Sequence, residues 1–175
     1  MSACDPKVFS FRPIQIGGGG DLPFLAHLYA STRLEEMAAS GWESEQIDNF
    51  LKQQFEAQHV FYMEQFADAK FDLILSGKGE PIGRLYLEER EEEFRIIDIA
   101  LLPEFRGQGT GSIILSQIIE QASDHGKVVR IHVEQNNPAM KLYLRLGFRK
   151  VEDKGIYFLM EHCGKGDLLN CSPAA

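Results

Sequence analysis

One short stretch of this sequence decides its fold: Arg106-Gly107-Gln108-Gly109-Thr110-Gly111. It follows an apolar, β-branched run that ends at Pro103, and it precedes residues 112–119, whose apolar side chains begin a helix. A strand, a glycine turn and a helix N-terminus in this order let backbone N–H groups close around a phosphate. The turn lacks the glycine spacing of dinucleotide sites and the lysine of Walker loops. We therefore expect this turn to bind another oxygen-rich ligand, and a pyrophosphate group fits it best.

The composition predicts one soluble globular domain. The chain has 175 residues, of which 44% are hydrophobic and 25% charged, and no apolar run approaches the ~20 residues of a membrane span. The net charge of −8 argues against a general nucleic-acid binder, which needs basic residues to neutralise phosphates. We expect a single domain over residues 1–163, a flexible tail over 164–175, and a cytoplasmic location with no membrane partner.

The three cysteines predict no metal site. Cys4, Cys163 and Cys171 make an odd number without the spacing of metal ligands. Free thiols in a reducing compartment are the plain interpretation.

Hydrophobic periodicity predicts an α/β fold, an α+β sandwich whose mixed, mostly antiparallel sheet of about seven strands is flanked by about four helices. The expected strands are residues 8–12, 71–76, 82–88, 94–102, 128–134, 148–152 and 155–161. The expected helices begin near Pro23, Glu45, Gly109 and Ala139, and Asp21 is expected to cap the first of them. The charged run Glu88–Glu93 is expected to stand in water at a hairpin tip.

Two motifs resemble one known family. Residues 101–111, LLPEFRGQGTG, look like the acyl-CoA-binding motif of the GNAT superfamily of N-acyltransferases, whose core is R/Q-x-x-G-x-G/A. Residues 137–148, NPAMKLYLRLGF, are similar to the family's second motif, N-x-A-x-x-L-Y-x-x-L-G-F. The resemblance implies the GNAT fold, in which the strands at 94–102 and 128–134 splay apart to admit the cofactor.

The resemblance also implies a binding site for acetyl-CoA. Backbone groups of Ile99, Ala100 and Leu101 would pair with the pantetheine arm, as an added strand does. The pyrophosphate would lie against Arg106, Gly107, Gln108, Gly109, Thr110, Gly111 and Ser112. Asn137, or Asn136 in a slightly different register, would hydrogen-bond the arm.

The resemblance also implies a general acid. Tyr143 matches its usual general acid, because a phenol with an ordinary pKa of ~10 is protonated at neutral pH and can donate to the departing thiolate. The alternative is that Tyr143 only packs on the cofactor. A carboxylate or an ordered water would accept the proton of the amine, and Asp98 and Glu134 are the candidate carboxylates. Asp98 could instead hold the substrate ammonium or pair with an arginine, and His132 is expected to be a sheet residue.

The predicted function is acetyl transfer from acetyl-CoA to a primary amine, by direct attack in a ternary complex. A non-catalytic CoA-binding sensor or interaction module is the alternative. Polar residues of the first two helices would line the acceptor pocket or form a solvated face: Arg33, Glu36, Gln54 and Gln58. The aromatic second helix favours a covered pocket for a small-molecule amine, and it could also serve a homodimer.

Overall fold

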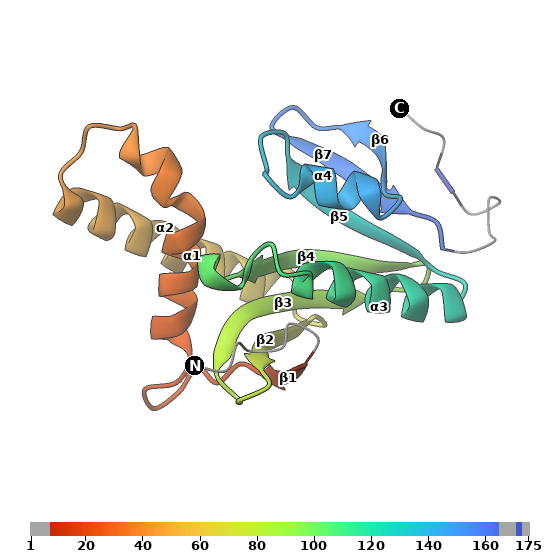
Figure 1. Cartoon of the computed structure of the whole chain (residues 1–175), viewed down its shortest axis with the longest axis horizontal. Helices are drawn as coiled ribbons and strands as arrows, with labels where there is room; N and C mark the ends of the chain where they lie inside the picture. The colour runs from red at the N-terminus through yellow and green to blue at the C-terminus, as the bar shows by residue number, and fades with distance from the viewer. Residues whose placement is uncertain (1–7, 165–170, 173–175) are drawn as a thin grey trace. The chain divides into compact units, whose positions relative to one another are not determined.

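The computed structural model describes residues 8–164 and 171–172, and within them the predicted strands and helices are all present (Figure 1). The strands are β1 (Phe9–Pro13), β2 (Lys70–Ser76), β3 (Pro81–Glu89), β4 (Glu93–Leu101), β5 (Val128–Glu134), β6 (Arg149–Asp153) and β7 (Tyr157–His162). The helices are α1 (Leu22–Ala38), α2 (Ser44–Gln65), α3 (Thr110–Asp124) and α4 (Met140–Arg145), with a 3-10 turn, η1 (Pro103–Phe105), before α3.

The seven strands form one sheet in the order β1-β2-β3-β4-β5-β7-β6. β1 pairs with β2, β5 with β7 and β6 with β7, all antiparallel, whereas β4 and β5 run parallel. The prediction of a mixed, mostly antiparallel sheet with four helices is confirmed. The register of β6 against β7 shifts between Lys150 and Glu152, where one extra residue interrupts the ladder.

The parallel pair β4–β5 is short. Its register runs from Glu93 opposite Val128 to Ile96 opposite Ile131. Ile97 and Asp98, which follow in β4, have no registered partner on β5, whereas β5 keeps its antiparallel register with β7 as far as Glu134. The registered parallel pairing therefore ends at Ile96, as expected for the splayed pair that the family resemblance implies.

The described residues form two compact units. Residues 8–85 and 99–106 make up the first unit, and residues 86–98, 107–164 and 171–172 make up the second. β3 and β4 each contribute residues to both units. The single domain over 1–163 stays a prediction, and most of the predicted tail lies outside the described residues.

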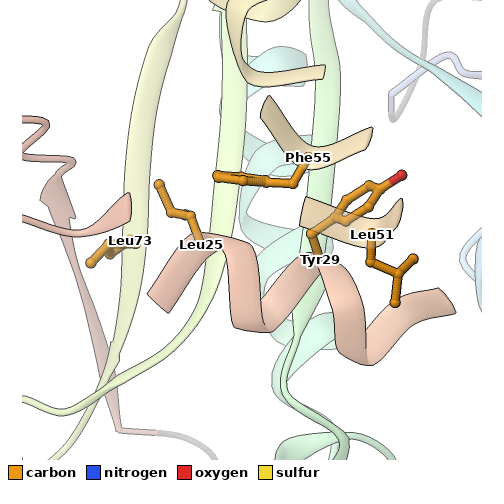
Figure 2. Close-up of a cluster of buried hydrophobic side chains, with 5 residues drawn as sticks. All are labelled: Leu25, Tyr29, Leu51, Phe55 and Leu73. Atoms are coloured by element: carbon orange, nitrogen blue, oxygen red, sulfur yellow. The ribbon is translucent and has the colours of Figure 1, made fainter. Parts of the chain in front are cut away.

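The core of the first unit gathers side chains from two helices and one strand, as Figure 2 shows. α1 contributes Leu25 and Tyr29, α2 contributes Leu51 and Phe55, and β2 contributes Leu73. In each helix the two residues are four apart, so they lie on one face. Burying each such side chain stabilises the fold by about 1.5–3 kcal/mol.

α1 and α2 begin within one residue of the expected starts, but the expected cap of α1 by the Asp21 side chain is absent. Asp21 precedes α1, but its side chain makes no capping bond. Its carboxylate accepts hydrogen bonds from Arg12 at 2.8 Å and from the backbone N–H of Gln15 at 2.7 Å. The charged bond to Arg12 is stronger than a capping bond to a helix amide, so the carboxylate binds the arginine instead. α2 begins with a capping box between Glu43 and Gln46.

The charged run at the β3–β4 hairpin is not wholly solvated, which corrects the sequence prediction. Glu93 is only 5% exposed and forms ion pairs with Arg90, Arg95 and Arg130. Burial raises the pKa of Glu93, but the charges and hydrogen bonds of Arg95 and Arg130 outweigh it and leave the pKa below its ordinary value. A glutamate that looks like a surface residue in sequence thus belongs to a buried network of the second unit.

In the second unit the core lies between α3 and β5, which are in contact. Ile114, Leu115 and Ile118 of α3 are buried, as are Ile131 and Val133 of β5. The alternate residues of β5 are more exposed, so this strand presents one apolar and one polar face. No helix among the described residues is long and apolar enough to cross a membrane.

The expectation of free thiols is wrong for two of the three cysteines. Cys163, just after β7, and Cys171 are joined by a disulfide, with their Cα atoms 5.7 Å apart. Cys4 lies outside the described residues.

Candidate functional site

The glycine turn leads directly into α3. Gly107 and Gly109 have φ values of +70° and +94°, a left-handed conformation that glycine adopts without strain. A Cβ atom added at either position would meet nothing within 4 Å. The backbone here is therefore exposed, and a ligand atom can contact its N–H groups directly because no side chain stands between them.

The amides of the first turn of α3 point out of the helix end. The first backbone hydrogen bond runs from Ile113 N–H to the carbonyl of Gly109, at 3.0 Å. The N–H groups of Gly111 and Ser112 precede this bond, and first-turn amides have no intrahelical acceptor. The helix dipole adds positive potential, so this end of α3 favours an anion.

Arg106, in the first unit, is held by protein groups. Its Nε donates to the carbonyl of Leu101 at 2.8 Å, and its Nη2 donates to Ser31 Oγ at 3.3 Å. Both bonds fix the backbone just before the turn. Whether the residue also contacts a cofactor, as the sequence predicts for it and for Gln108 and Thr110, stays a prediction.

Tyr143 is the buried tyrosine of α4. It is 4% exposed, and its ring meets that of Phe148 edge to face, with centroids 5.6 Å apart. Burial raises the pKa of Tyr143 well above its ordinary value, and the negative charge of Asp98 raises it further. The phenol is thus protonated throughout the physiological range, as a proton donor must be.

The candidate bases differ in their surroundings. Asp98 and Tyr143 belong to the same unit, and the charge of Asp98 raises the pKa of the Tyr143 phenol. Glu134 is the last residue of β5, and it lies on the same face as His132, as expected for residues two apart. Nδ1 of His132 lies 3.1 Å from Arg95 Nη1, and burial together with that arginine lowers the pKa of the histidine. His132 is therefore a hydrogen-bonded sheet residue, as predicted.

Asn137 shapes the start of α4. Its Oδ1 accepts a hydrogen bond from the backbone N–H of Ala139 at 2.8 Å, while its own N–H donates to the carbonyl of Glu134 at 2.9 Å. Asn136 is more exposed. Both asparagines remain candidates for the cofactor arm, because the bond from Ala139 uses only the oxygen of the Asn137 amide.

The predicted acceptor residues fall into separate environments in the first unit. Arg33 and Glu36 pair with each other at 3.2 Å, with the Glu36 side chain 61% exposed. Gln54 is exposed, whereas Gln58 accepts a hydrogen bond from the buried Arg84 at 2.8 Å. Gln58 is therefore the member of this set held in a buried polar cluster.

Sequence reasoning missed the other members of that cluster. Arg84 is 3% exposed on β3. Burial lowers the pKa of the neighbouring His59, and so does the charge of Arg84. A cation inside the apolar run of residues 82–86 is the same kind of signal that singled out Asp98, and it could have identified this arginine.

Comparison with known proteins places residues 31–148 in the Acetyltransferase (GNAT) family. The [ribosomal protein bS18]-alanine N-acetyltransferase of Haemophilus influenzae is 31% identical over 68 residues, which are 38% of this chain and 47% of that protein. An uncharacterized N-acetyltransferase of Methanocaldococcus jannaschii is 32% identical over 83 residues, 42% of this chain and 37% of that protein. The matches thus span less than half the length of these curated relatives.

Solved structures share the fold. The PaiA N-acetyltransferase of Thermoplasma acidophilum, crystallised with coenzyme A, superposes with a TM-score of 0.64 at 18% identity, covering 89% of this chain and 98% of that one. At this identity the likeness concerns the fold alone.

Proposed function

The chain belongs to the GNAT family of acetyltransferases, and from that premise we propose that it is an N-acetyltransferase that moves an acetyl group from acetyl-CoA to a primary amine. The observation that carries the proposal is the exposed glycine backbone at the N-terminus of α3, where no side chain fills the space above Gly107 and Gly109. The comparison structure crystallised with coenzyme A supports the same ligand.

The residues present fit such a cofactor. Amides from Gly107 to Ser112 would hold the pyrophosphate at the start of α3, and the extended arm would add to β4 as a strand does. Backbone groups of Ile99 to Leu101, and Asn136 or Asn137, are the proposed partners of that arm. Bound acetyl-CoA would supply the thioester that the amine attacks.

Tyr143 is the proposed proton donor. Its phenol is buried and protonated, so it can give a proton to the departing sulfur and then recover it from solvent. Its raised pKa makes it a weaker acid than a free tyrosine, yet the same shift keeps the phenol protonated and neutral at high pH. Asp98, whose charge acts on Tyr143, and Glu134 at the end of β5 are the proposed acceptors of the amine proton.

The acceptor is proposed to be a small-molecule amine. The relative from Haemophilus influenzae is named for an alanine of ribosomal protein bS18, which makes an amine of a protein the main competitor. Attack by a free amine needs no covalent enzyme intermediate. Acetylation of a small-molecule amine and acetylation of a protein amine would use the same proton donor and the same base.

A thiol-release assay tests the proposal. The purified chain is incubated with acetyl-CoA and a panel of polyamines, amino acids, aminoglycosides and peptides with free N-termini. Calorimetry with CoA is run beside it. We expect CoA binding and faster release of CoA thiol with one class of amine; absence of CoA binding at millimolar ligand would overturn the proposal.

Tyr143→Phe separates chemistry from binding. We expect kcat to fall about 10²- to 10⁴-fold with CoA affinity retained, because only the proton donor is removed. Tyr157→Phe is the matched control, since Tyr157 is 42% exposed on β7. An unchanged rate for Tyr143→Phe would remove that residue from its proposed role.

A further inference from the structure

The end of β7 carries a carboxylate that is completely buried. Glu161 has 0% of its surface exposed, and its Oε2 accepts a hydrogen bond from Arg130 Nε at 2.7 Å. Arg130 also donates to Glu93 at 2.8 Å, which ties Glu161 to the buried network at the start of β4. A buried carboxylate is costly unless all of its acceptor sites are satisfied.

Ser172 supplies the remaining donors. Its backbone N–H donates to Glu161 Oε1 at 2.8 Å, and its hydroxyl donates to Oε2 at 3.1 Å. Arg130 Nη2 in turn donates to Ser172 Oγ at 3.2 Å. The segment Cys171–Ser172 therefore completes the coordination of Glu161, although it lies eleven residues further along the chain.

A disulfide holds that segment in place. Cys171 is bonded to Cys163, two residues after Glu161, and both cysteines are only partly buried. The bond closes a sequence separation of only 8 residues, so it removes little chain entropy compared with a bridge across a whole domain. Its main effect is local, because it presents Ser172 to the carboxylate.

The sulfur of Cys163 lies beside a cation. Arg149 Nη2 lies 3.1 Å from Cys163 Sγ, while Glu161 Oε1 lies 3.7 Å from the same sulfur. The charge of Glu161 is already opposed by Arg130, so the nearer guanidinium of Arg149 favours a thiolate at Cys163. This cation favours the departure of Cys163 as a thiolate when the disulfide is attacked at Cys171.

We propose that Cys163 and Cys171 form a reversible thiol–disulfide switch that fastens the segment Cys171–Ser172 onto the buried carboxylate of Glu161. The partner is a small-molecule thiol and its disulfide, such as glutathione. A glutathione thiolate attacks Cys171 Sγ, the S–S bond breaks, and Cys163 leaves as a thiolate. A second glutathione thiolate attacks the glutathione sulfur of this mixed disulfide, and Cys171 leaves as a thiolate. One glutathione disulfide and, after protonation, two protein thiols result.

A redox titration tests the reversibility. Cys4→Ser protein, which keeps only the two cysteines of interest, is equilibrated over a series of reduced-to-oxidised glutathione ratios from both directions. Acid quenching, alkylation and peptide mass spectrometry then follow each cysteine. We expect both cysteines to change together between the alkylated and the linked form, at the same ratio from either direction. Free thiols at every ratio, linkage that no ratio reverses, or independent glutathione adducts on the two residues would overturn the proposal.

Hydrogen exchange tests the attachment. In the oxidised form the Ser172 amide is expected to exchange at least tenfold more slowly than in the reduced form, because only there is it held against Glu161. Equal exchange in the two forms would show that the disulfide does not hold the segment Cys171–Ser172 against Glu161. Far-UV circular dichroism of both forms confirms that the fold is retained.

Two variants test the role of the guanidinium. Arg149→Gln is expected to slow the reduction by glutathione about tenfold, whereas Lys150→Gln, next to it on β6, leaves the rate unchanged. Lys150 pairs with Asp153 rather than with a cysteine, which makes it the matched control. Equal rates for the two variants would contradict the assignment of Cys163 as leaving group.

Discussion

Gly109→Ala tests the phosphate site through the backbone alone. Gly109 has a φ of +94°, where an L-residue is strained by about 1–2 kcal/mol. The new methyl group would clash with nothing in the protein, since no atom lies within 4 Å of it. It would, however, occupy the space through which a phosphate reaches the first-turn amides of α3.

Two losses are therefore expected. The free energy of unfolding should fall by about 1–2 kcal/mol from the strain. Losing one hydrogen bond from an amide to a charged phosphate, at about 1.5–3 kcal/mol, should raise the Kd for CoA about ten- to a hundredfold. Urea unfolding measures the first quantity, and isothermal calorimetry with CoA measures the second.

Gly79→Ala is the matched control. Gly79 has a φ of +79° in the β2–β3 turn and is likewise open within 4 Å, so the strain is similar and the ligand site is untouched. It should lose stability and keep the Kd for CoA. If Gly109→Ala loses the same stability and still binds CoA as tightly as the wild type, the glycine turn is not the phosphate site.

Three further changes probe the fold. Phe55→Ala should lower the free energy of unfolding in urea by about 3–5 kcal/mol, whereas Phe61→Ala, at a side chain 54% exposed on the same helix, should change it by less than about 0.5 kcal/mol. Gly83→Ala should cost at least about 1–3 kcal/mol by the same measurement, because its Cβ would lie 2.3 Å from the carbonyl oxygen of Ala100. Burial lowers the pKa of His162 below 6.5, so the unfolded chain binds the proton first as the pH falls, and the stability of the wild type should drop from about pH 6.5 downward. His162→Gln should show a shallower drop of the urea midpoint between about pH 7.5 and 5.5. Parallel curves for the two proteins would contradict this expectation.

The elements of this fold are readable from sequence because each depends on neighbours along the chain. The alternation in residues 128–134 predicts β5 without error at either end, and Gly107 and Gly109 adopt the left-handed conformation that the turn needs. The separation of β4 from β5 was not visible in either strand alone. The family resemblance implied this separation, and the short parallel register of β4 against β5 confirms it.

What the sequence could not reveal depends on partners from distant elements. Glu93 lies in a charged run, and only the arginines on β4 and β5 explain why it is buried. Cys171 and Cys163 are joined although their number and spacing suggested free thiols. In the candidate site, Gln58 could be singled out by its helix position, but its partner Arg84 on β3 could not.

The two outermost strands bear on how the protein behaves at high concentration. β1 and β6 end the strand order and are both five residues long. β6 has charged side chains and an interrupted register, while the last residue of β1 is Pro13, whose carbonyl accepts a hydrogen bond from Arg12. Short, charged or irregular edges are poor templates for adding a strand from another copy. The sheet thus carries its own protection against edge-to-edge aggregation.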